Sequence, residues 1–118
     1  MKNTAFLLYA LCAFGANLFS QTNITSKTVL VGSNGWANNS VNTVVFRKNS
    51  LCTYNNTQYI SYYNNDGYVV LGKRKIGHKK WQLQTTSFKG NVADAHNSIS
   101  IITDGEGYLH MAWNHHGN

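Results

Sequence analysis

The chain has 118 residues, of which 42% are hydrophobic and 12% are charged, so it has the length of one small domain. Its formal net charge is +6, because 10 Lys and Arg residues stand against 4 Asp and Glu residues. A basic chain suits a polyanionic partner, although net charge by itself also serves solubility. The sequence contains no recognisable nucleic-acid-binding motif, so we expect no nucleic acid as a partner.

The first 20 residues have the pattern of a signal peptide. Lys2 precedes a short apolar run at 5–19, and Ser20 offers a small residue before a cut at Gln21. A membrane-spanning helix needs about 20 apolar residues, so we expect no stable membrane anchor. Cleavage lowers the net charge by one, from +6 to +5, and leaves Cys52 as the only cysteine. We therefore expect an exported protein, secreted or periplasmic, without an internal disulfide.

From position 41 onward the sequence is dominated by strand signals. Short Asn-rich turns, among them Asn64-Asn65-Asp66-Gly67, separate runs of Tyr, Val and Ile and favour antiparallel hairpins. No helix of useful length is predicted after the apolar start. The expected strands are a lead-in strand at 28–31 and then 41–48, Leu51–Tyr54, Thr57–Tyr63, Tyr68–Lys75 and 80–85.

The end of the chain predicts one further β-hairpin with histidines at its open end. Its strands are expected at 98–103 and 108–113, and an acidic, Gly-rich loop at 104–107 joins them. If the residues on either side of this loop pair, His96 faces His115, and His116 lies one residue further along. A bulge would shift the register by one residue, so spacing alone does not choose between His115 and His116.

Four short strands, a connecting stretch and two further strands are typical of a β-propeller, whose blades are four-stranded sheets. We therefore expect an all-β fold, with a signal peptide at 1–20 and the N-terminal part of a propeller domain at 21–118. One blade is expected at about 51–85, and a partial blade at about 97–118. A propeller needs about four to eight blades, so the sequence predicts a fragment of a longer protein. A complete small β-sandwich is the structural alternative.

Several segments resemble one known group of proteins. The segments are 42–51, 66–75, 94–100 and 107–118, and they include Asp94-Ala95-His96-Asn97 and His115-His116-Gly117-Asn118. They are similar to the opening blades of the bacterial-neuraminidase-repeat propellers that include the ulvan lyases. The resemblance covers nearly all of residues 32–118, and it implies a seven-bladed propeller. In the characterised lyases it also implies cleavage of a uronic-acid-containing algal polysaccharide by β-elimination, with a Tyr and an Arg from later blades completing the site.

β-Elimination needs a base, an acid and a group that neutralises the substrate carboxylate. Histidine can serve as base or acid near neutral pH, because its unperturbed pKa is about 6.5. By motif, His96 and His116 match the catalytic histidines of the family. Asn97 and His115 are expected to bind substrate, Asn97 through a hydrogen bond to the carboxylate, and Asp94 is expected to orient an imidazole.

Other interpretations of these residues stay open. The histidines could be loop residues that satisfy local hydrogen bonds, or they could bind zinc or copper. No HExxH or paired-cysteine spacing supports a metal, so we expect neither a metal nor a cofactor. His110 is expected to be a packed, hydrogen-bonded strand residue. The lysines and Arg74 at 73–80 are expected to form a solvated hairpin end, with attraction of a sulfated, carboxylated chain as the alternative.

The sequence thus predicts a secreted polysaccharide lyase that acts on an anionic polysaccharide, with the fragment alone inactive. A non-catalytic glycan-binding propeller is the first alternative, and a sialidase-like glycoside hydrolase is the second. Arg47 and Arg74 are the only arginines, so the arginine cluster of a sialidase cannot be assembled from this stretch. The loop at 104–107 also departs from the Ser-x-Asp-x-Gly-x-Thr-Trp pattern of sialidase repeats.

Overall fold

The computed structural model describes residues 24–44 and 49–117, and every regular element in them is a β-strand. The predicted all-β class is therefore confirmed. Within these residues no helix is long and apolar enough to cross a membrane. The strands are β1 (Leu51–Tyr54), β2 (Thr57–Tyr63), β3 (Tyr68–Lys75), β4 (Gln82–Lys89), β5 (Ser100–Thr103) and β6 (Leu109–Ala112).

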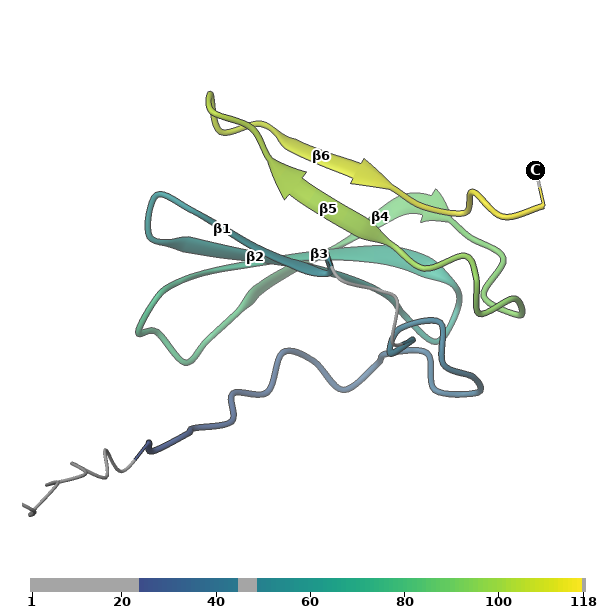
Figure 1. Cartoon of the computed structure of the whole chain (residues 1–118). Helices are drawn as coiled ribbons and strands as arrows, with labels where there is room; N and C mark the ends of the chain where they lie inside the picture. Colours follow the sequence, from purple (N-terminus) through teal and green to yellow (C-terminus); the bar gives the residue numbers. More distant parts are fainter. Residues whose placement is uncertain (1–23, 45–48, 118) are drawn as a thin grey trace, which may run out of the picture.

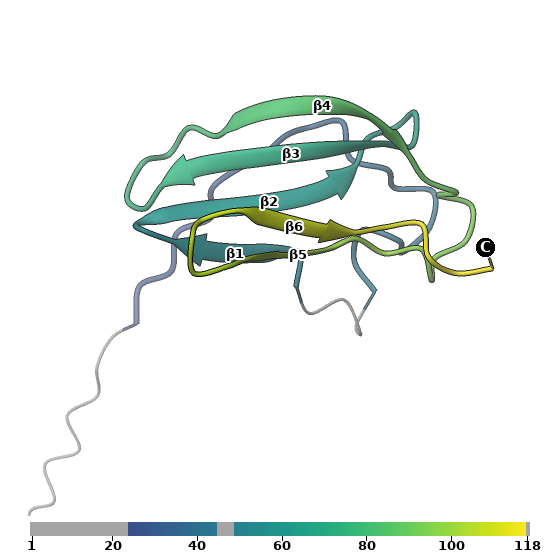
Figure 2. The same ribbon diagram turned by 90° about the horizontal axis from the view of Figure 1, so that it is seen from above.

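Strands β1 to β4 form one antiparallel sheet in chain order, and β5 pairs with β6 in a separate hairpin. The predicted bounds of β1, β2 and β3 are confirmed residue for residue. In the tight β1–β2 turn, Asn55 and Asn56 have φ of 42° and 60°, a conformation that Asn tolerates and that matches the twist of a hairpin. The β5–β6 hairpin lies over one face of the sheet, against β1 and β2 (Figures 1 and 2). The arrangement is that of one blade and one hairpin of another.

The β2–β3 turn is organised by a single asparagine side chain. Oδ1 of Asn64 accepts hydrogen bonds from the backbone N–H groups of Asp66 and Tyr68, at 3.0 and 2.9 Å. Gly67 has a φ of 81°, which its lack of a Cβ atom allows. This combination makes a three-residue loop with a bulge at the glycine.

The β5–β6 turn has the same structure 40 positions later in the chain. Oδ1 of Asp104 accepts from the N–H groups of Glu106 and Tyr108, at 3.0 and 2.9 Å. Gly107 repeats the positive φ, at 93°. Propeller blades repeat with a period of about 40 residues, so the shared turn indicates that β5–β6 is the counterpart of β2–β3 in the next blade.

This turn corrects the predicted hairpin register. The loop closes through a hydrogen bond from the N–H of Asp104 to the carbonyl of Tyr108, so three residues lie between the paired positions instead of four. The bulge at the glycine accounts for the shift by one residue. Continued beyond β5 and β6, the observed register places His96 opposite His116, whereas the predicted register placed it opposite His115.

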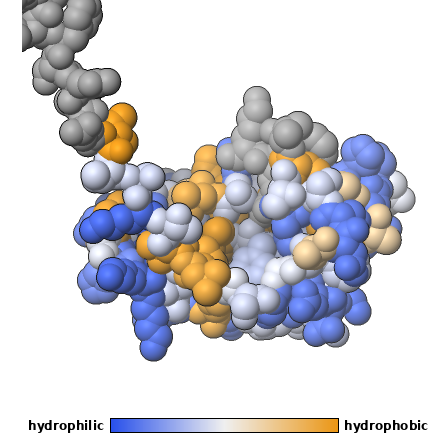
Figure 3. All heavy atoms as spheres, turned by 90° about the horizontal axis from the view of Figure 1, so that it is seen from below, coloured by the Kyte–Doolittle hydropathy of each residue, from blue (hydrophilic) through white to orange (hydrophobic). Residues whose placement is uncertain are grey.

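The hydrophobic core lies between the sheet and the hairpin. Its fully buried members are at most 2% exposed: Val41, Tyr63, Val69, Ile99 and Ile101. Burying such a side chain stabilises the fold by about 1.5–3 kcal/mol, so this cluster holds the hairpin on the first blade. Figure 3 views the molecule from below and shows a band of apolar surface between hydrophilic groups.

The start of the described chain differs from the prediction. Residues 41–43 form a turn, closed by a hydrogen bond from the N–H of Thr43 to the carbonyl of Ser40, where the sequence predicted the beginning of a strand at 41–48. The side chain of Asn42 explains this, because it binds both the N–H and the carbonyl of Tyr63 and so takes the place of a strand partner.

Two further strand predictions need correction. Residues 28–31 form no strand, and β4 runs over Gln82–Lys89 instead of 80–85. A bulge extends β4, because Oγ1 of Thr86 donates to the carbonyl of Val69 and lets pairing resume at Lys89. The predicted signal peptide at 1–20 lies outside the described residues.

Candidate functional site

The segment that joins β4 to β5 folds into a compact loop, residues 90–97, which we call the histidine loop. The backbone N–H of Asp94 and the side-chain amide of Asn97 both donate to the carbonyl of Asn91. From outside the loop, the side-chain amide of Asn39 donates to two of its backbone carbonyls, at 2.7 and 3.1 Å. These bonds fix the backbone that carries Asp94, at the end of the sheet where β2 finishes.

One carboxylate binds both candidate imidazoles. Oδ1 of Asp94 lies 2.8 Å from Nδ1 of His96, and Oδ2 lies 2.7 Å from Nδ1 of His116. The two rings stack with centroids 4.5 Å apart and an interplanar angle of 29°. Their side chains are 63% and 55% exposed, so a ligand in solution can reach them. Asp94 therefore aligns imidazoles that flank the two strands at the open end of the β5–β6 hairpin.

The ionisation of Asp94 sets the tautomer of both rings. Hydrogen bonds hold the pKa of Asp94 well below its ordinary value, first that from the backbone N–H of His96 and then those from the His116 and His96 side chains. An ionised carboxylate only accepts hydrogen bonds, so Nδ1 of each imidazole carries the proton that is donated to it. Nε2 is then the acceptor nitrogen of each neutral ring, and it is the atom that can take a proton from a ligand.

Asn97 is buried and supports the pair from inside. Its Oδ1 accepts the backbone N–H of His116 at 2.8 Å, and its own carbonyl accepts the hydroxyl of Tyr63 at 2.8 Å. Asn97 is only 1% exposed, which does not fit the predicted contact with substrate, because the amide has no surface to offer a ligand. The structure gives Asn97 a positioning role instead.

The other histidines lie outside this cluster. His115 is exposed and is not a member of it, so its part in substrate binding stays a prediction. The side chain of His110 is 61% exposed, and its Nε2 lies 2.8 Å from Oδ2 of Asp104. The expected hydrogen bond is present, but the expected packing is wrong, because the alternation of β6 turns Leu109 and Met111 inward. His110 and Asp104 form a second histidine–carboxylate pair, at the loop end of the hairpin.

The cluster also has the composition of a metal site. Asp94, His96 and His116 can each offer one ligand atom, and these atoms lie within 4.8 Å of one another. Two imidazoles and a carboxylate suit zinc, which in catalytic sites takes three protein ligands and keeps one open position. A metal held through Nδ1 would have to displace the protons that now bind Asp94. The absence of a metal stays a prediction.

Three positioning residues were missed by the sequence analysis. Tyr63 was one of several strand tyrosines, and Asn39 and Asn114 were single members of Asn-rich segments. The carbonyl of Tyr63 accepts from Trp36, and Oδ1 of Asn114 accepts from the N–H of Asn91 at 2.6 Å. The two-residue alternation of β2 could have marked Tyr63 as buried, but no local signal marks the asparagines.

Residues 57–118 match the BNR repeat-containing family, named for the bacterial neuraminidase repeat. The matched stretch covers more than half of the chain and includes β2 to β6 and the histidine cluster. The chain belongs to the BNR repeat-containing family. A search of curated proteins found none that matches it. BNR repeats occur in sialidase-like propellers and in other proteins that act on glycans, which fits the antiparallel blade and the repeated turn.

Proposed function

We propose that this BNR-repeat protein is an exported polysaccharide lyase of the ulvan lyase kind. Its substrate would be a uronic-acid-containing anionic polysaccharide, cleaved by β-elimination. The observation that carries the proposal is the shared carboxylate: Asp94 holds Nδ1 of both His96 and His116, so each ring has Nε2 as its proton-accepting atom. A seven-bladed ring, in which a Tyr and an Arg from later blades complete the site, is part of the same proposal.

β-Elimination transfers one proton away from the sugar and one onto the leaving group. The base takes the proton from the carbon beside the carboxylate, and the electron pair of that C–H bond forms a C=C bond. The bond to the glycosidic oxygen breaks, its electron pair stays on that oxygen, and an acid protonates the oxygen. A neutral imidazole at His96 or His116 can take the proton through Nε2. Since the ring centroids are 4.5 Å apart, the second imidazole can contact the same uronic residue and, when protonated, bind its carboxylate.

The carboxylates of the two described histidine pairs bind imidazoles. Most glycosidases use two carboxyl groups that flank the scissile bond. In the described part of the chain the cluster holds one carboxylate, Asp94, whose two oxygens both bind imidazoles. Asp104 is bound to His110 at the other end of the hairpin. The carboxylate of the cluster is thus engaged in orienting the two histidines.

The test is to supply the full-length protein with ulvan and to measure ultraviolet absorption and reducing ends together. Elimination leaves an unsaturated uronic end that absorbs in the ultraviolet, so the proposal predicts that both signals rise in equal numbers. A chelator should leave the rate unchanged. Reducing ends without unsaturated product would identify a hydrolase, and binding without either signal would identify a glycan-binding propeller.

A further inference from the structure

A basic pocket of about 440 Å³ opens at the far end of the first blade. Its cationic lining comes from Lys73, Arg74, Lys75 and Lys80, and Tyr59 and Gln82 add neutral hydrogen-bonding groups. The lysines are exposed, as predicted for a solvated hairpin end. They also line one concave site, which we call the basic pocket.

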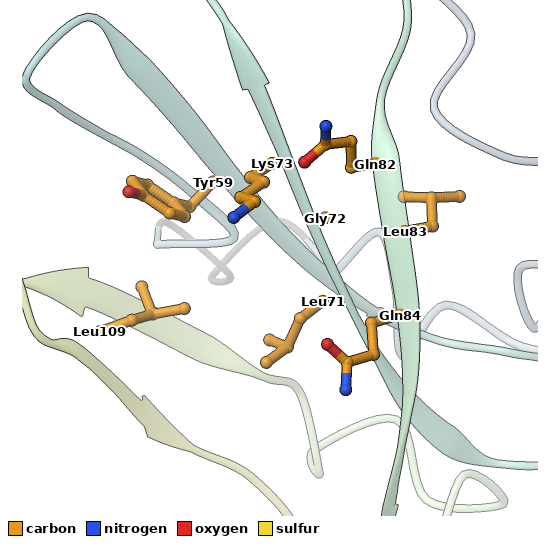
Figure 4. Close-up of a pocket in the computed structure, with 8 residues that line it drawn as sticks. All are labelled: Tyr59, Leu71, Gly72, Lys73, Gln82, Leu83, Gln84 and Leu109. Atoms are coloured by element: carbon orange, nitrogen blue, oxygen red, sulfur yellow. The ribbon is translucent and has the colours of Figure 1, made fainter.

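Strand pairing places four of the lining residues on one face of the sheet, namely Tyr59, Lys73, Lys75 and Gln82, whereas Arg74 alternates to the opposite face. Tyr59 of β2 is the register partner of Lys73 on β3, and Lys73 is in turn the partner of Gln82 on β4. Directly paired residues have Cβ atoms about 4.5–5.5 Å apart, and residues two apart on a strand share a face. Lys75 therefore adds a second ammonium group beside that of Lys73. Figure 4 shows Tyr59, Lys73 and Gln82 together on the three strands.

Arg74 is held in place before any ligand arrives. Its Nε donates to the side chain of Gln58 at 2.8 Å, and one terminal nitrogen donates to the carbonyl of His78 at 3.3 Å. Its guanidinium lies 4.7 Å from the ring centroid of Trp81, within the range of a cation–π contact. These contacts hold Arg74 on the sheet face opposite Lys73 and Lys75.

No carboxylate of the described residues neutralises the pocket. The ion pairs in this part of the chain all join a histidine to Asp94 or Asp104, and no acid lines the pocket. Cations that share a concave surface repel one another, and an anion bound among them removes that repulsion. The positive charge of the pocket therefore favours the binding of an oxyanion such as sulfate or carboxylate.

The pocket and the histidine cluster lie at opposite ends of the blade. β2 begins at Thr57, which lines the pocket, and ends at Tyr63, whose hydroxyl binds Asn97 in the histidine loop. At about 3.4 Å per residue, the two sites are roughly 20 Å apart along the strand. One sugar residue cannot touch both sites, so the lysines do not belong to the candidate active site.

A second pocket adjoins the basic pocket at Lys73 and continues toward apolar side chains. It measures about 300 Å³, shares Tyr59, Lys73 and Gln82 with the basic pocket, and continues to Leu71 and to Leu109 of β6 (Figure 4). Apolar side chains beside hydrogen-bonding groups suit a sugar ring, which has an apolar face and a polar edge. The two pockets together have the chemistry of a charged saccharide.

We propose that the basic pocket binds the sulfate or carboxylate group of an anionic polysaccharide and anchors the polymer at a second site, apart from the histidines. The choice of polysaccharide as the polyanion rests on the proposed function. Lys73, Lys75 and Lys80 supply the ammonium donors that bind the oxyanion. The neighbouring pocket receives the adjoining sugar.

Calorimetric titration of the full-length protein with dextran sulfate tests this proposal. Lys73→Gln combined with Lys75→Gln should weaken binding at least about tenfold, because both ammonium groups that share this face with Tyr59 and Gln82 are removed. Lys89→Gln is the control: its ammonium lies 5.0 Å from the ring centroid of Tyr68, at the histidine end of the sheet, and binding should change little. Equal Tm values for the three proteins would show that the variants are folded.

The outcomes separate this proposal from the proposed function. Unchanged affinity for dextran sulfate in the double variant would contradict binding in the basic pocket. An equal loss of affinity per removed charge in the Lys89 variant would contradict it as well. Equally tight, lysine-dependent binding of single-stranded DNA would overturn its assignment to polysaccharide. Turnover of a uronic disaccharide, too short to bridge the roughly 20 Å between the sites, should be the same in wild type and double variant. If no elimination product forms while dextran sulfate binding still depends on Lys73 and Lys75, the pocket stands and the lyase proposal fails.

Discussion

The hydroxyl of Tyr63 donates a hydrogen bond of 2.8 Å to the backbone carbonyl of Asn97, between the core of the first blade and the histidine loop. Tyr63 is 0% exposed and Asn97 is 1% exposed, so water does not compete for this bond. The side chain of Asn97 then binds the backbone of His116. The position of one candidate catalytic histidine thus depends on a tyrosine of the preceding blade.

Tyr63→Phe should lower the free energy of unfolding by about 1–3 kcal/mol, because it leaves a buried carbonyl without its donor. Turnover should fall as well, since the histidine loop loses the hydrogen bond that joins it to β2. Tyr62→Phe is the matched control, because that hydroxyl binds Asn34 at an exposed site and its loss should cost less than about 0.5 kcal/mol. Denaturant unfolding of both variants measures the difference, and equal stabilities would contradict the role of Tyr63.

Gly107→Ala should destabilise the protein by about 1 kcal/mol or more, because its φ of 93° disfavours any residue with a Cβ atom. An added Cβ would also lie 3.0 Å from the ring of Tyr54. Gly105→Ala, two residues earlier, meets nothing within 4 Å and should be nearly neutral. Thermal unfolding of the pair checks the bulge that sets the hairpin register; the opposite order of Tm would speak against that register.

Much of the first blade could be predicted because its signals are local. The alternation in β2 and β3 and the turn at Asn64 specify the strands without distant contacts, and both strands were predicted with their observed bounds. The hairpin register failed by one residue, because it depends on whether Gly107 takes a left-handed conformation inside a longer loop. The strand predicted at 41–48 failed where Asn42 binds the backbone of β2 in place of a strand neighbour.

The composition of the candidate site was predictable, but its geometry was not. His96 and His116 could be brought to one end of a hairpin from strand pairing alone. Both imidazoles bind the carboxylate of Asp94 because of the way the loop at 90–97 folds. That fold depends on hydrogen bonds from Asn39, which is more than 50 positions away in the chain. The burial of Asn97 follows from the same loop, and no pattern around it distinguishes a buried amide from an exposed one.

Asp94→Asn should reduce turnover by at least about 10²-fold, because an amide can accept from one imidazole only and presents N–H groups to the other. The second ring must then turn or change tautomer, and its Nε2 no longer accepts a proton. Asp104→Asn makes the same change in the exposed pair with His110 and should leave turnover unaltered. Steady-state kinetics should show the Asp94 effect mainly in kcat; equal rates for the two variants would remove Asp94 from the mechanism.

The Asp94 carboxylate should titrate well below the ordinary Asp value of about 3.9. A carboxylate with a lowered pKa in the folded state favours folding above the unfolded value, and that contribution is lost as pH falls through the folded pKa. The Asp94 carboxylate should therefore stay ionised from neutral pH down to about pH 4, and its contribution to stability should be lost only in stronger acid. The carboxyl carbon shift of Asp94, followed by NMR against pH, measures this, and an inflection near 4 or above would contradict the hydrogen-bonded arrangement.

The rate of unsaturated product formation from ulvan tests most directly whether the stacked imidazoles perform proton transfer on a uronic acid. His96→Ala and His116→Ala in the full-length protein should each lower that rate by about 10²- to 10⁴-fold, the usual contribution of a general acid or base. Their Tm should change little, because both side chains are more than half exposed. His110→Ala, which removes an equally exposed histidine from an equivalent carboxylate pair, should retain the wild-type rate. Wild-type rates in both the His96 and His116 variants would contradict the account.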